Sequence, residues 1–313
     1  MCSSDLTWYR DEYVKTGPEK YAKGKEPKLY ESAGGAWKLT TSERKRILLS
    51  HIYGVDIDSQ AVEVTKLSLL LKVLEGETKD SVSTQRRLFN ERALPDLSKN
   101  IKCGNSLIGS DFYKDKQLDL FNEEERIRIN AFDWEEEFKE VFKNGGFDAV
   151  IGNPPYHSVK LMPAVEKDYF YSKYRTGVKR FNLYSIFIEK ACFILSQTGL
   201  LGFIVPSSLL ANDQYQELRE HIIENYRIRE IVDFEGGVFK GANVETLILL
   251  IARATSQKER SSNIVKISHD IVDFKNGQYL QDTRLQQSFS SNKGSVFTLD
   301  RKSTRLNSSH VSQ

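Results

Sequence analysis

Residues 147–156 read FDAVIGNPPY, and this stretch decides how the rest of the chain is interpreted. An apolar run at 149–151 ends at Gly152, and Asn153, two prolines and Tyr156 follow at once. A short apolar run bounded by such residues predicts a buried β-strand. The question is why a buried strand should end in an amide, two rigid rings and an aromatic side chain.

Similar apolar runs recur along the chain and alternate with amphipathic segments. Further strands are predicted at 51–56, 100–103, 200–205, 228–234 and 246–252. Helices are predicted at 60–74, where Asp58 or Ser59 can cap the first turn, and at 182–196 and 214–225. Strands separated by amphipathic helices indicate an α/β fold with a mostly parallel, doubly wound sheet.

Composition places the chain among water-soluble globular proteins. It has 313 residues, of which 39% are hydrophobic and 28% charged. No apolar run approaches the length of a membrane span, and the N-terminus is too polar for a secretory signal. The three cysteines and five histidines never reach a metal-ligand spacing. We therefore expect a cytoplasmic protein without a membrane partner or a structural metal.

In α/β sheets, ligands bind beyond the carboxyl ends of the strands. Three predicted strand ends carry polar groups, namely Asp56, Asn105 and Asn153. A carboxylate such as Asp56, between a strand and a helix, can bind a ribose diol. Asn105 can hydrogen-bond to the edge of a purine. Taken singly, Asp56 is also an ordinary acid at a helix start, and Asn105 an ordinary turn residue.

The Asn-Pro-Pro-Tyr sequence presents a rigid group of hydrogen-bond acceptors. Pro154 and Pro155 fix φ and lack backbone donors, so the carbonyl groups beside them stay free to accept. The side-chain oxygen of Asn153 is a further acceptor, and Tyr156 offers a flat face. These groups suit an amino group on an aromatic base. The alternative is a turn that merely leaves the sheet.

Residues 157–181 are rich in basic and aromatic side chains, although the formal net charge of the whole chain is only +2. The basic residues are Lys160, Lys167, Lys173, Arg175, Lys179 and Arg180, and the aromatic residues between them are Tyr169, Phe170, Tyr171 and Tyr174. Charge combined with stacking rings is typical of a surface that binds a nucleic-acid strand. The alternative is a solvated loop with some rings packed inward.

Six segments in one order resemble the S-adenosylmethionine-dependent adenine-N6 DNA methyltransferases of type II and type IIG restriction–modification systems. The segments are YGVDID with AVEVTKLSLLLK, then KCGNSLIG, FDAVIGNPPY, FNLYSIFIEKACFIL, GLLGFIVPSSLL and GVFKGANVETLILLI. The similarity extends over residues 8–255. It implies a class I, Rossmann-like methyltransferase fold.

The resemblance implies a cofactor site for S-adenosylmethionine. Asp56 would hold the cofactor ribose, and Ile57 would pack on its adenine. Asn105 would meet the adenine amino group. The family often has Asp at this position, so a side chain that both donates and accepts hydrogen bonds replaces one that only accepts.

The resemblance also implies a target, an adenine flipped out of double-stranded DNA. Asn153 and the carbonyl of Pro154 would grip its amino nitrogen, with Pro155 keeping the backbone rigid. Tyr156 would stack on one face of the base, and Phe239 on the other. The basic residues expected to contact DNA are Lys160, Lys173, Arg175, Lys179 and Arg180.

Parts of the family pattern are missing from the chain. The glycine-rich first motif does not occur within residues 1–50, so we expect the central strand of the sheet, between the strands ending at Asp56 and Gly152, to be absent. Both termini resemble translated adapter sequence, which suggests an internal piece of a longer protein. We therefore do not expect the chain to be active alone, and any fused or partner endonuclease and any specificity domain would lie outside it.

This interpretation divides the chain into four parts. They are an irregular segment at 1–46, a partial methyltransferase domain at 47–255, the start of a target-recognition region at 256–300 and a tail at 301–313. Two other functions stay open: an inactive methyltransferase-like subunit that binds DNA, and a related enzyme that methylates RNA or protein. The insertions and the IEKACFIL segment favour the restriction–modification group.

Overall fold

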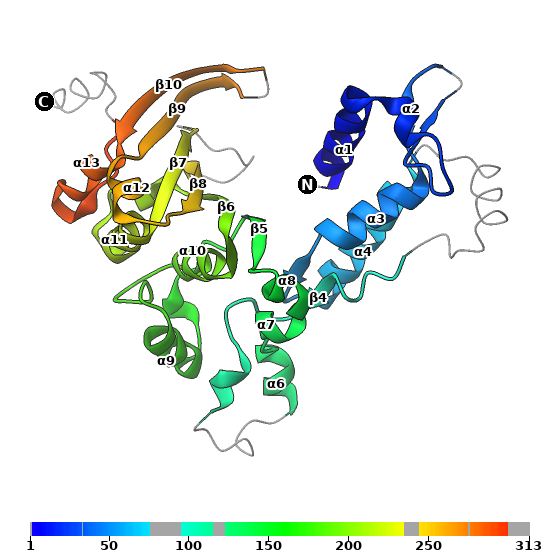
Figure 1. Ribbon diagram of the computed structural model, residues 1–313. Coiled ribbons are helices and arrows are strands. Elements are labelled where there is room, and N and C mark those ends of the chain that lie inside the picture. Colours follow the sequence, from blue (N-terminus) through cyan, green and yellow to red (C-terminus); the bar gives the residue numbers. More distant parts are fainter. Residues whose placement is uncertain are drawn as a thin grey trace, which may run out of the picture. The chain divides into compact units, whose positions relative to one another are not determined.

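The computed structural model describes residues 2–32, 34–75, 95–114, 123–234, 244–274 and 276–299. They form two compact units, Met1–Asp133 and Trp134–Gln313 (Figure 1). The boundaries expected at residues 46 and 255 do not coincide with this division, and they stay predictions.

The first unit begins with a small layer of helices and a hairpin. Its elements are α1 (Cys2–Thr16), α2 (Pro18–Tyr21), β1 (Leu29–Glu31), β2 (Trp37–Leu39) and α3 (Thr41–His51). Residues 1–46, expected to be irregular, are therefore mostly ordered. Tyr13 of α1 packs against Leu29, Leu39 and Ile47 in one buried cluster, and these contacts between distant segments leave no clear periodic pattern in the sequence.

The rest of the first unit holds two strands that the sequence predicted. β3 (Gly54–Asp56) pairs in parallel with β4 (Ile101–Cys103). Between them, α4 (Ser59–Leu74) begins where Asp58 accepts a hydrogen bond from the backbone N–H of Gln60 at 2.8 Å, so the predicted cap is present. A short 3-10 turn, η1 (Ser110–Tyr113), and α6 (Glu123–Ile129) complete this unit.

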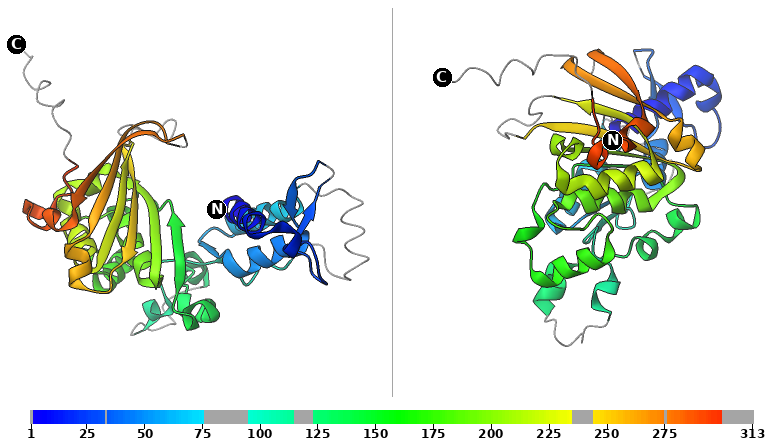
Figure 2. Two further views of the ribbon diagram at one scale, coloured as in Figure 1. Left: turned by 45° about the horizontal axis from the view of Figure 1, so that its top comes forward. Right: turned by 90° about the vertical axis from the view of Figure 1, so that its left-hand side faces the viewer.

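The second unit is built on a six-stranded sheet with the order β10-β9-β7-β8-β6-β5 (Figure 2). The strands are β5 (Phe147–Gly152), β6 (Leu195–Pro206), β7 (Tyr226–Asp233), β8 (Thr246–Arg253), β9 (Ile264–Asp273) and β10 (Gln278–Leu285). β5 pairs in parallel with β6, and β7 with β9, whereas β8 is antiparallel to both β6 and β7.

The α/β class predicted from the sequence is confirmed, but the sheet is mixed and not mostly parallel. β8 follows β7 in the chain without a crossover helix among the described residues, and strands joined in this way pair antiparallel. Because β6 and β7 both run antiparallel to β8, they run in the same direction as each other and as β5. The carboxyl ends of β5, β6 and β7 therefore lie along one edge of the sheet.

Helices α10 (Leu183–Ile194) and α11 (Gln216–Asn225) pack on one face of this sheet. The remaining helical elements are α7 (Trp134–Glu137), α8 (Lys139–Lys143), η3 (Val159–Leu161), α9 (Ala164–Lys173), η4 (Ser207–Leu210), η5 (Asp213–Tyr215), α12 (Gln257–Ser261), α13 (Gln286–Ser290) and η6 (Lys293–Ser295). Residues 157–181, expected to form a loop, thus contain a helix.

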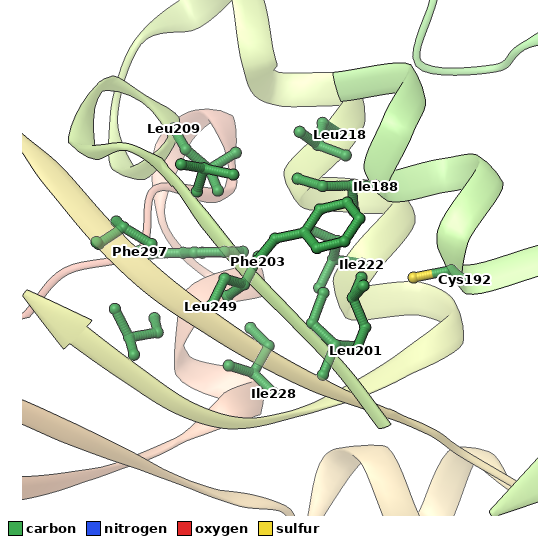
Figure 3. Close-up of a cluster of buried hydrophobic side chains, with 14 of the residues drawn as sticks. Ile188, Cys192, Leu201, Phe203, Leu209, Leu218, Ile222, Ile228, Leu249 and Phe297 are labelled. Atoms are coloured by element: carbon green, nitrogen blue, oxygen red, sulfur yellow. The ribbon is translucent and has the colours of Figure 1, made fainter. Parts of the chain in front are cut away.

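The core of the second unit lies between these helices and the sheet. Figure 3 shows Ile188 of α10 and Ile222 of α11 converging on Leu201 and Phe203 of β6. All four are buried, and each burial stabilises the fold by about 1.5–3 kcal/mol. A side chain at Gly152 would come within 2.8 Å of the Phe203 ring, so the end of β5 requires a glycine.

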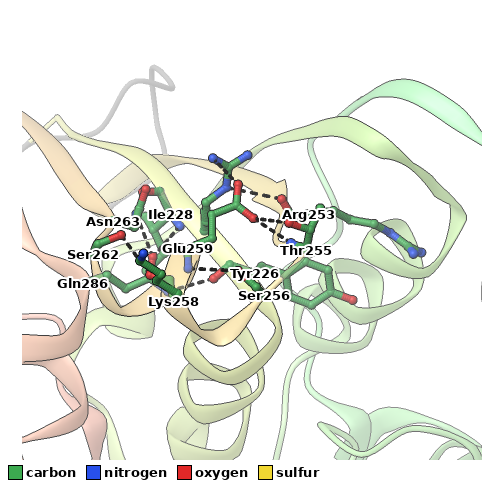
Figure 4. A network of polar contacts seen from close by, with 11 residues as sticks. Tyr226, Ile228, Arg253, Thr255, Ser256, Lys258, Glu259, Ser262, Asn263 and Gln286 are labelled. Carbon is green, nitrogen blue, oxygen red and sulfur yellow. Dashed lines mark hydrogen bonds and ion pairs between the residues drawn. The ribbon is translucent and has the colours of Figure 1, made fainter.

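A network of polar contacts lies at the opposite end of the strands, where β7 begins (Figure 4). Gln286 accepts from the backbone N–H of Ile228 at 2.8 Å and donates to the carbonyl of Tyr226 at 2.7 Å. Nearby, Glu259 of α12 forms an ion pair with Arg227 at 2.6 Å. This network ties α12 and α13 to β7, and it lies at the edge away from Asn153.

β3 and β5 belong to separate sheets. Within the described part of the chain, β3 pairs with β4 alone and β5 with β6 alone. No described strand therefore pairs with both of them. β1 and β2 pair with each other and extend neither sheet. Among the described residues, no helix is both long and apolar enough to cross a membrane.

Candidate functional site

Asp56 and Ile57 lie where β3 ends and the chain turns towards α4. Both side chains are exposed, and Ile57 keeps 54% of its surface accessible. One carboxylate oxygen of Asp56 accepts from the backbone N–H of Asp58 at 2.9 Å, which orients the carboxylate. An oriented acid beside an exposed branched apolar side chain matches a ribose diol and a purine face.

Asn105 follows β4 at the same edge of the two-stranded sheet. The backbone N–H of Gly104 donates to the carbonyl of Asp56 at 2.8 Å, which places the two strand ends side by side. The side-chain oxygen of Asn105 accepts from the N–H of Leu107 at 3.0 Å. Its amide nitrogen is the group left to turn towards a ligand, and it would donate where an Asp would accept.

Asn130, which the sequence did not single out, also lies at this edge, where it contacts Cys103 and Asn105. The amide of Asn130 donates to the sulfur of Cys103 at 3.3 Å, and the carbonyl of Asn130 accepts from the N–H of Asn105 at 2.7 Å. Asn130 has a φ of 46°, in the left-handed region that Asn tolerates better than most residues. The only sequence signal was an Asn directly before the apolar pair AF.

The residues present fit the cofactor that the resemblance implies. Asp56 can accept two hydroxyl hydrogen bonds, Ile57 can cover a ring face, and Asn105 can reach a ring edge. A side chain at Gly104 would come within 2.4 Å of the Phe132 ring, so only glycine allows the backbone to pass here. The described part of the chain contains no group of three acidic, His or Cys side chains able to hold a metal ion.

Asn153, Pro154, Pro155 and Tyr156 follow β5 in the second unit. Asn153 is exposed, whereas Pro154 is buried and anchors the turn. Tyr156 is half-buried, and its hydroxyl donates to the carbonyl of Ile204 in β6 at 3.3 Å. Burial raises the pKa of Tyr156 above its ordinary value, so the ring is a neutral surface at physiological pH.

The chain beyond Tyr156 leaves the sheet, forms α9 and returns to the start of α10. The two ends of this excursion are joined by hydrogen bonds from Val159 N–H to Phe181 O at 3.1 Å and from Leu183 N–H to His157 O at 2.9 Å. Residues 157–183 therefore form an insertion whose two ends are paired antiparallel.

The rings of this insertion divide into two groups. Phe170 and Tyr174 are buried, and they form part of its interior. Tyr171 is 44% exposed and packs edge-on against Phe181, with ring centroids 5.8 Å apart. Only part of the aromatic set expected to face a nucleic acid is therefore at the surface.

The basic side chains predicted to contact DNA are all exposed, namely Lys160, Lys173, Arg175, Lys179 and Arg180. The guanidinium of Arg175 pairs with Glu224 of α11 at 2.6 Å. Hydrogen bonds to Glu224 raise the pKa of Arg175, which keeps it charged but partly neutralised by its partner. Its role at a DNA surface stays a prediction.

The structure thus gathers the predicted residues at two strand edges. Asp56, Ile57 and Asn105 share one edge in the first unit, and Asn153 to Tyr156 share another in the second. Phe239 lies outside the described residues.

In α/β folds, polar residues beyond the carboxyl ends of strands form ligand-binding sites. Comparison with known sequences gives the family of this chain. The Eco57I restriction-modification methylase family matches residues 50–239, and the chain belongs to this family.

Two curated relatives show the extent of the likeness. The chain is 33% identical over 273 residues to the type II restriction enzyme and methyltransferase RM.Eco57I of Escherichia coli, a match that covers 86% of this chain and 24% of that protein. It is 29% identical over 189 residues to the type II methyltransferase M.AccI of Acinetobacter calcoaceticus, covering 54% of this chain and 32% of that one. The chain thus matches only a quarter to a third of either relative.

Among solved structures, the chain is similar to a nuclease-deletion mutant of the type ISP restriction-modification enzyme LlaGI in complex with a DNA substrate mimic. The TM-score is 0.50 at 15% identity, over 85% of this chain and 20% of that one. At this identity the likeness supports the fold alone.

Proposed function

We propose that the chain is the catalytic part of a DNA methyltransferase that transfers a methyl group from S-adenosylmethionine to the N6 amino group of adenine. The observation that carries this proposal is the exposed Asn153 beside the buried, rigid Pro154 at the carboxyl end of a parallel strand. Membership of a restriction-modification methylase family supports it.

The amino group of adenine is a poor nucleophile because its lone pair is delocalised into the ring. The side-chain oxygen of Asn153 and the carbonyl of Pro154 accept hydrogen bonds from its two N–H groups, which favours a pyramidal nitrogen with a localised lone pair. Pro155 keeps these acceptors in place, because its ring fixes the backbone. The bond from the methyl carbon to the sulfonium sulfur breaks as the bond to N6 forms, and N6 then loses one proton to water. Catalysis comes from positioning and electrostatics and needs no ionised acid or base.

The cofactor would be held by Asp56, Ile57 and Asn105, as their exposure and hydrogen bonds allow. When bound, S-adenosylmethionine supplies a methyl group on a sulfonium, which is an excellent leaving group. The chain's own task is to orient the ribose through the Asp56 carboxylate and to cover the purine with Ile57.

The target base would be an adenine extruded from duplex DNA, because N6 cannot be reached inside the helix. Tyr156 would stack on the extruded ring, and Phe239 would cover its other face. The exposed Lys160, Lys179 and Arg180 would contact the phosphates, so binding would weaken as salt rises.

The deciding experiment measures methyl transfer by this chain and by the whole reading frame that encodes it, with duplex DNA, RNA and protein as substrates. We expect the product of the whole reading frame to transfer the methyl group to adenine in DNA. In the active form, Asn153→Ala should reduce transfer by at least about 100-fold, as loss of one positioned group at a reacting centre does, and leave cofactor affinity unchanged.

The matched control is Asn144→Ala, an exposed turn asparagine of the same unit that lies before β5. It should retain full activity. Equal loss of transfer and cofactor binding in Asn153→Ala would show that Asn153 is structural. Transfer to RNA or protein in preference to DNA would overturn the substrate assignment.

A further inference from the structure

Tyr156, the proposed stacking ring, contacts a second tyrosine that has no assigned role. Its ring meets that of Tyr184 in an edge-to-face arrangement, with centroids 6.2 Å apart and planes at 81°. Tyr184 lies in the first turn of α10 and is completely buried. We propose that Tyr184 is a positioning residue that sets the orientation of the Tyr156 ring for stacking on the extruded base. This inference rests on the proposed function.

Tyr184 is itself packed against another buried tyrosine, Tyr215. The ring of Tyr215 lies 5.1 Å from that of Tyr184 at an angle of 44°, and Tyr215 is 1% exposed. Both tyrosines belong to the core cluster between the helices and the sheet. Because a packed core leaves a side chain no room to change rotamer, Tyr184 presents a fixed surface to Tyr156.

The hydrogen bond made by the Tyr156 hydroxyl restrains the ring only weakly. This hydroxyl donates to the carbonyl of Ile204 at 3.3 Å, well beyond the usual O–H···O distance of about 2.7–2.8 Å. A bond this long does little to fix the tilt of a ring. The contact with Tyr184, worth about 0.5–1.5 kcal/mol for such aromatic pairs, therefore restrains the ring orientation more than this hydrogen bond does.

The backbone keeps the two tyrosines together. His157 directly follows Tyr156, and Leu183 directly precedes Tyr184. The N–H of Leu183 donates to the carbonyl of His157 at 2.9 Å. This bond holds the turn after β5 beside the start of α10.

A ring held in its stacking orientation before the base arrives spares the cost of ordering it on binding, which is the general benefit of preorganisation. Removal of the Tyr184 ring should therefore weaken capture of the flipped base without touching the cofactor site. A residue that only filled the core would lower stability and leave base capture unchanged.

The test uses the whole reading frame and DNA duplexes with 2-aminopurine at the target position, whose fluorescence rises when the base is flipped. Tyr184→Leu should lower the flipping signal and kcat by about 2- to 10-fold, the equivalent of one aromatic contact. Cofactor affinity should not change. Tyr184→Phe keeps the ring and should restore both properties.

The matched control is Phe289→Leu, which truncates another fully buried ring of the same core cluster. It should lower the melting temperature to a similar degree and leave the flipping signal intact. If Tyr184→Leu does not fold, Tyr184→Met refills most of the volume with a flexible apolar chain.

The two hypotheses fail in different ways. A flipping signal in the Tyr184 variant equal to that of Phe289→Leu at equal stability overturns the positioning role alone. A wild-type protein that neither flips the base nor transfers a methyl group overturns the proposed function, and the positioning role with it.

Discussion

Arg219 of α11 shows how a single side chain can hold distant segments together. It is fully buried, yet it forms no ion pair within the described part of the chain. Its guanidinium donates to the carbonyls of Leu209 at 3.0 Å, Asn212 at 2.8 Å and Gly294 at 2.7 Å. One planar group thus satisfies three backbone carbonyls from two parts of the chain, a geometry that only Arg provides.

Replacement of Arg219 by Met should destabilise the protein by about 3 kcal/mol, because buried carbonyls lose charge-assisted hydrogen bonds. Arg219→Lys should lose most of the same stability, since an ammonium cannot reach all three carbonyls. Urea unfolding followed by tryptophan fluorescence measures the change. Arg229→Met, on the exposed surface of β7, is the matched control and should be nearly neutral. If both Arg219 variants unfold with the same free energy as wild type, Arg219 is dispensable for stability.

At the scale of elements, the hairpin of β9 and β10 is held by polar contacts as well as by backbone pairing. His269 of β9 lies between two carboxylates, with Nδ1 3.0 Å from Asp270 and Nε2 3.0 Å from Asp282 on β10. Burial disfavours the charged imidazole, but the hydrogen bonds to Asp282 and Asp270 outweigh it. The pKa of His269 is therefore raised above its ordinary value of about 6.5.

This raised pKa makes the hairpin more stable at low pH. The stabilisation is fully present below the unfolded pKa and is lost as pH rises through the higher folded pKa. We expect amide exchange in residues 264–285, corrected for the intrinsic pH effect, to be slower at pH 6 than at pH 8. His269→Gln should remove this dependence. A wild-type hairpin with the same protection at both pH values would contradict the assignment.

At the scale of the whole molecule, β5 is the exposed end of the six-stranded sheet. Among the residues that the structure describes, it pairs with β6 alone, and Ile151 on this strand is 63% exposed. An apolar edge strand of this kind offers unpaired backbone groups to another chain. Self-association through this edge is therefore the expected weakness of the second unit.

Ile151→Lys should reduce this self-association, because a charge on an edge strand opposes further strand pairing. Sedimentation velocity over a range of protein concentrations measures it. We expect wild-type protein to shift to larger species as its concentration rises and the variant to stay small. Leu161→Lys adds the same charge at another exposed apolar residue, outside any strand, and should leave association unchanged. If both variants behave as wild type, association does not involve β5.

The sequence by itself determined the α/β class, the strand that ends at Asp56, the strands that end shortly before Asn105 and Asn153, and the helices between them. It could do so because strand and helix periods, caps and strand-ending residues are local properties that depend on neighbours in the chain. The candidate strand ends were predictable for the same reason.

Only the tertiary structure decided which strands pair, that β8 runs antiparallel, and that the described residues within 2–46 and 264–285 form helices and strands. It also brought Tyr184 to Tyr156 and Asn130 to Asn105. These contacts join residues about 25 or more positions apart, and no local pattern encodes them. They exist because burial of apolar surface and pairing of backbone groups are satisfied by the whole chain together.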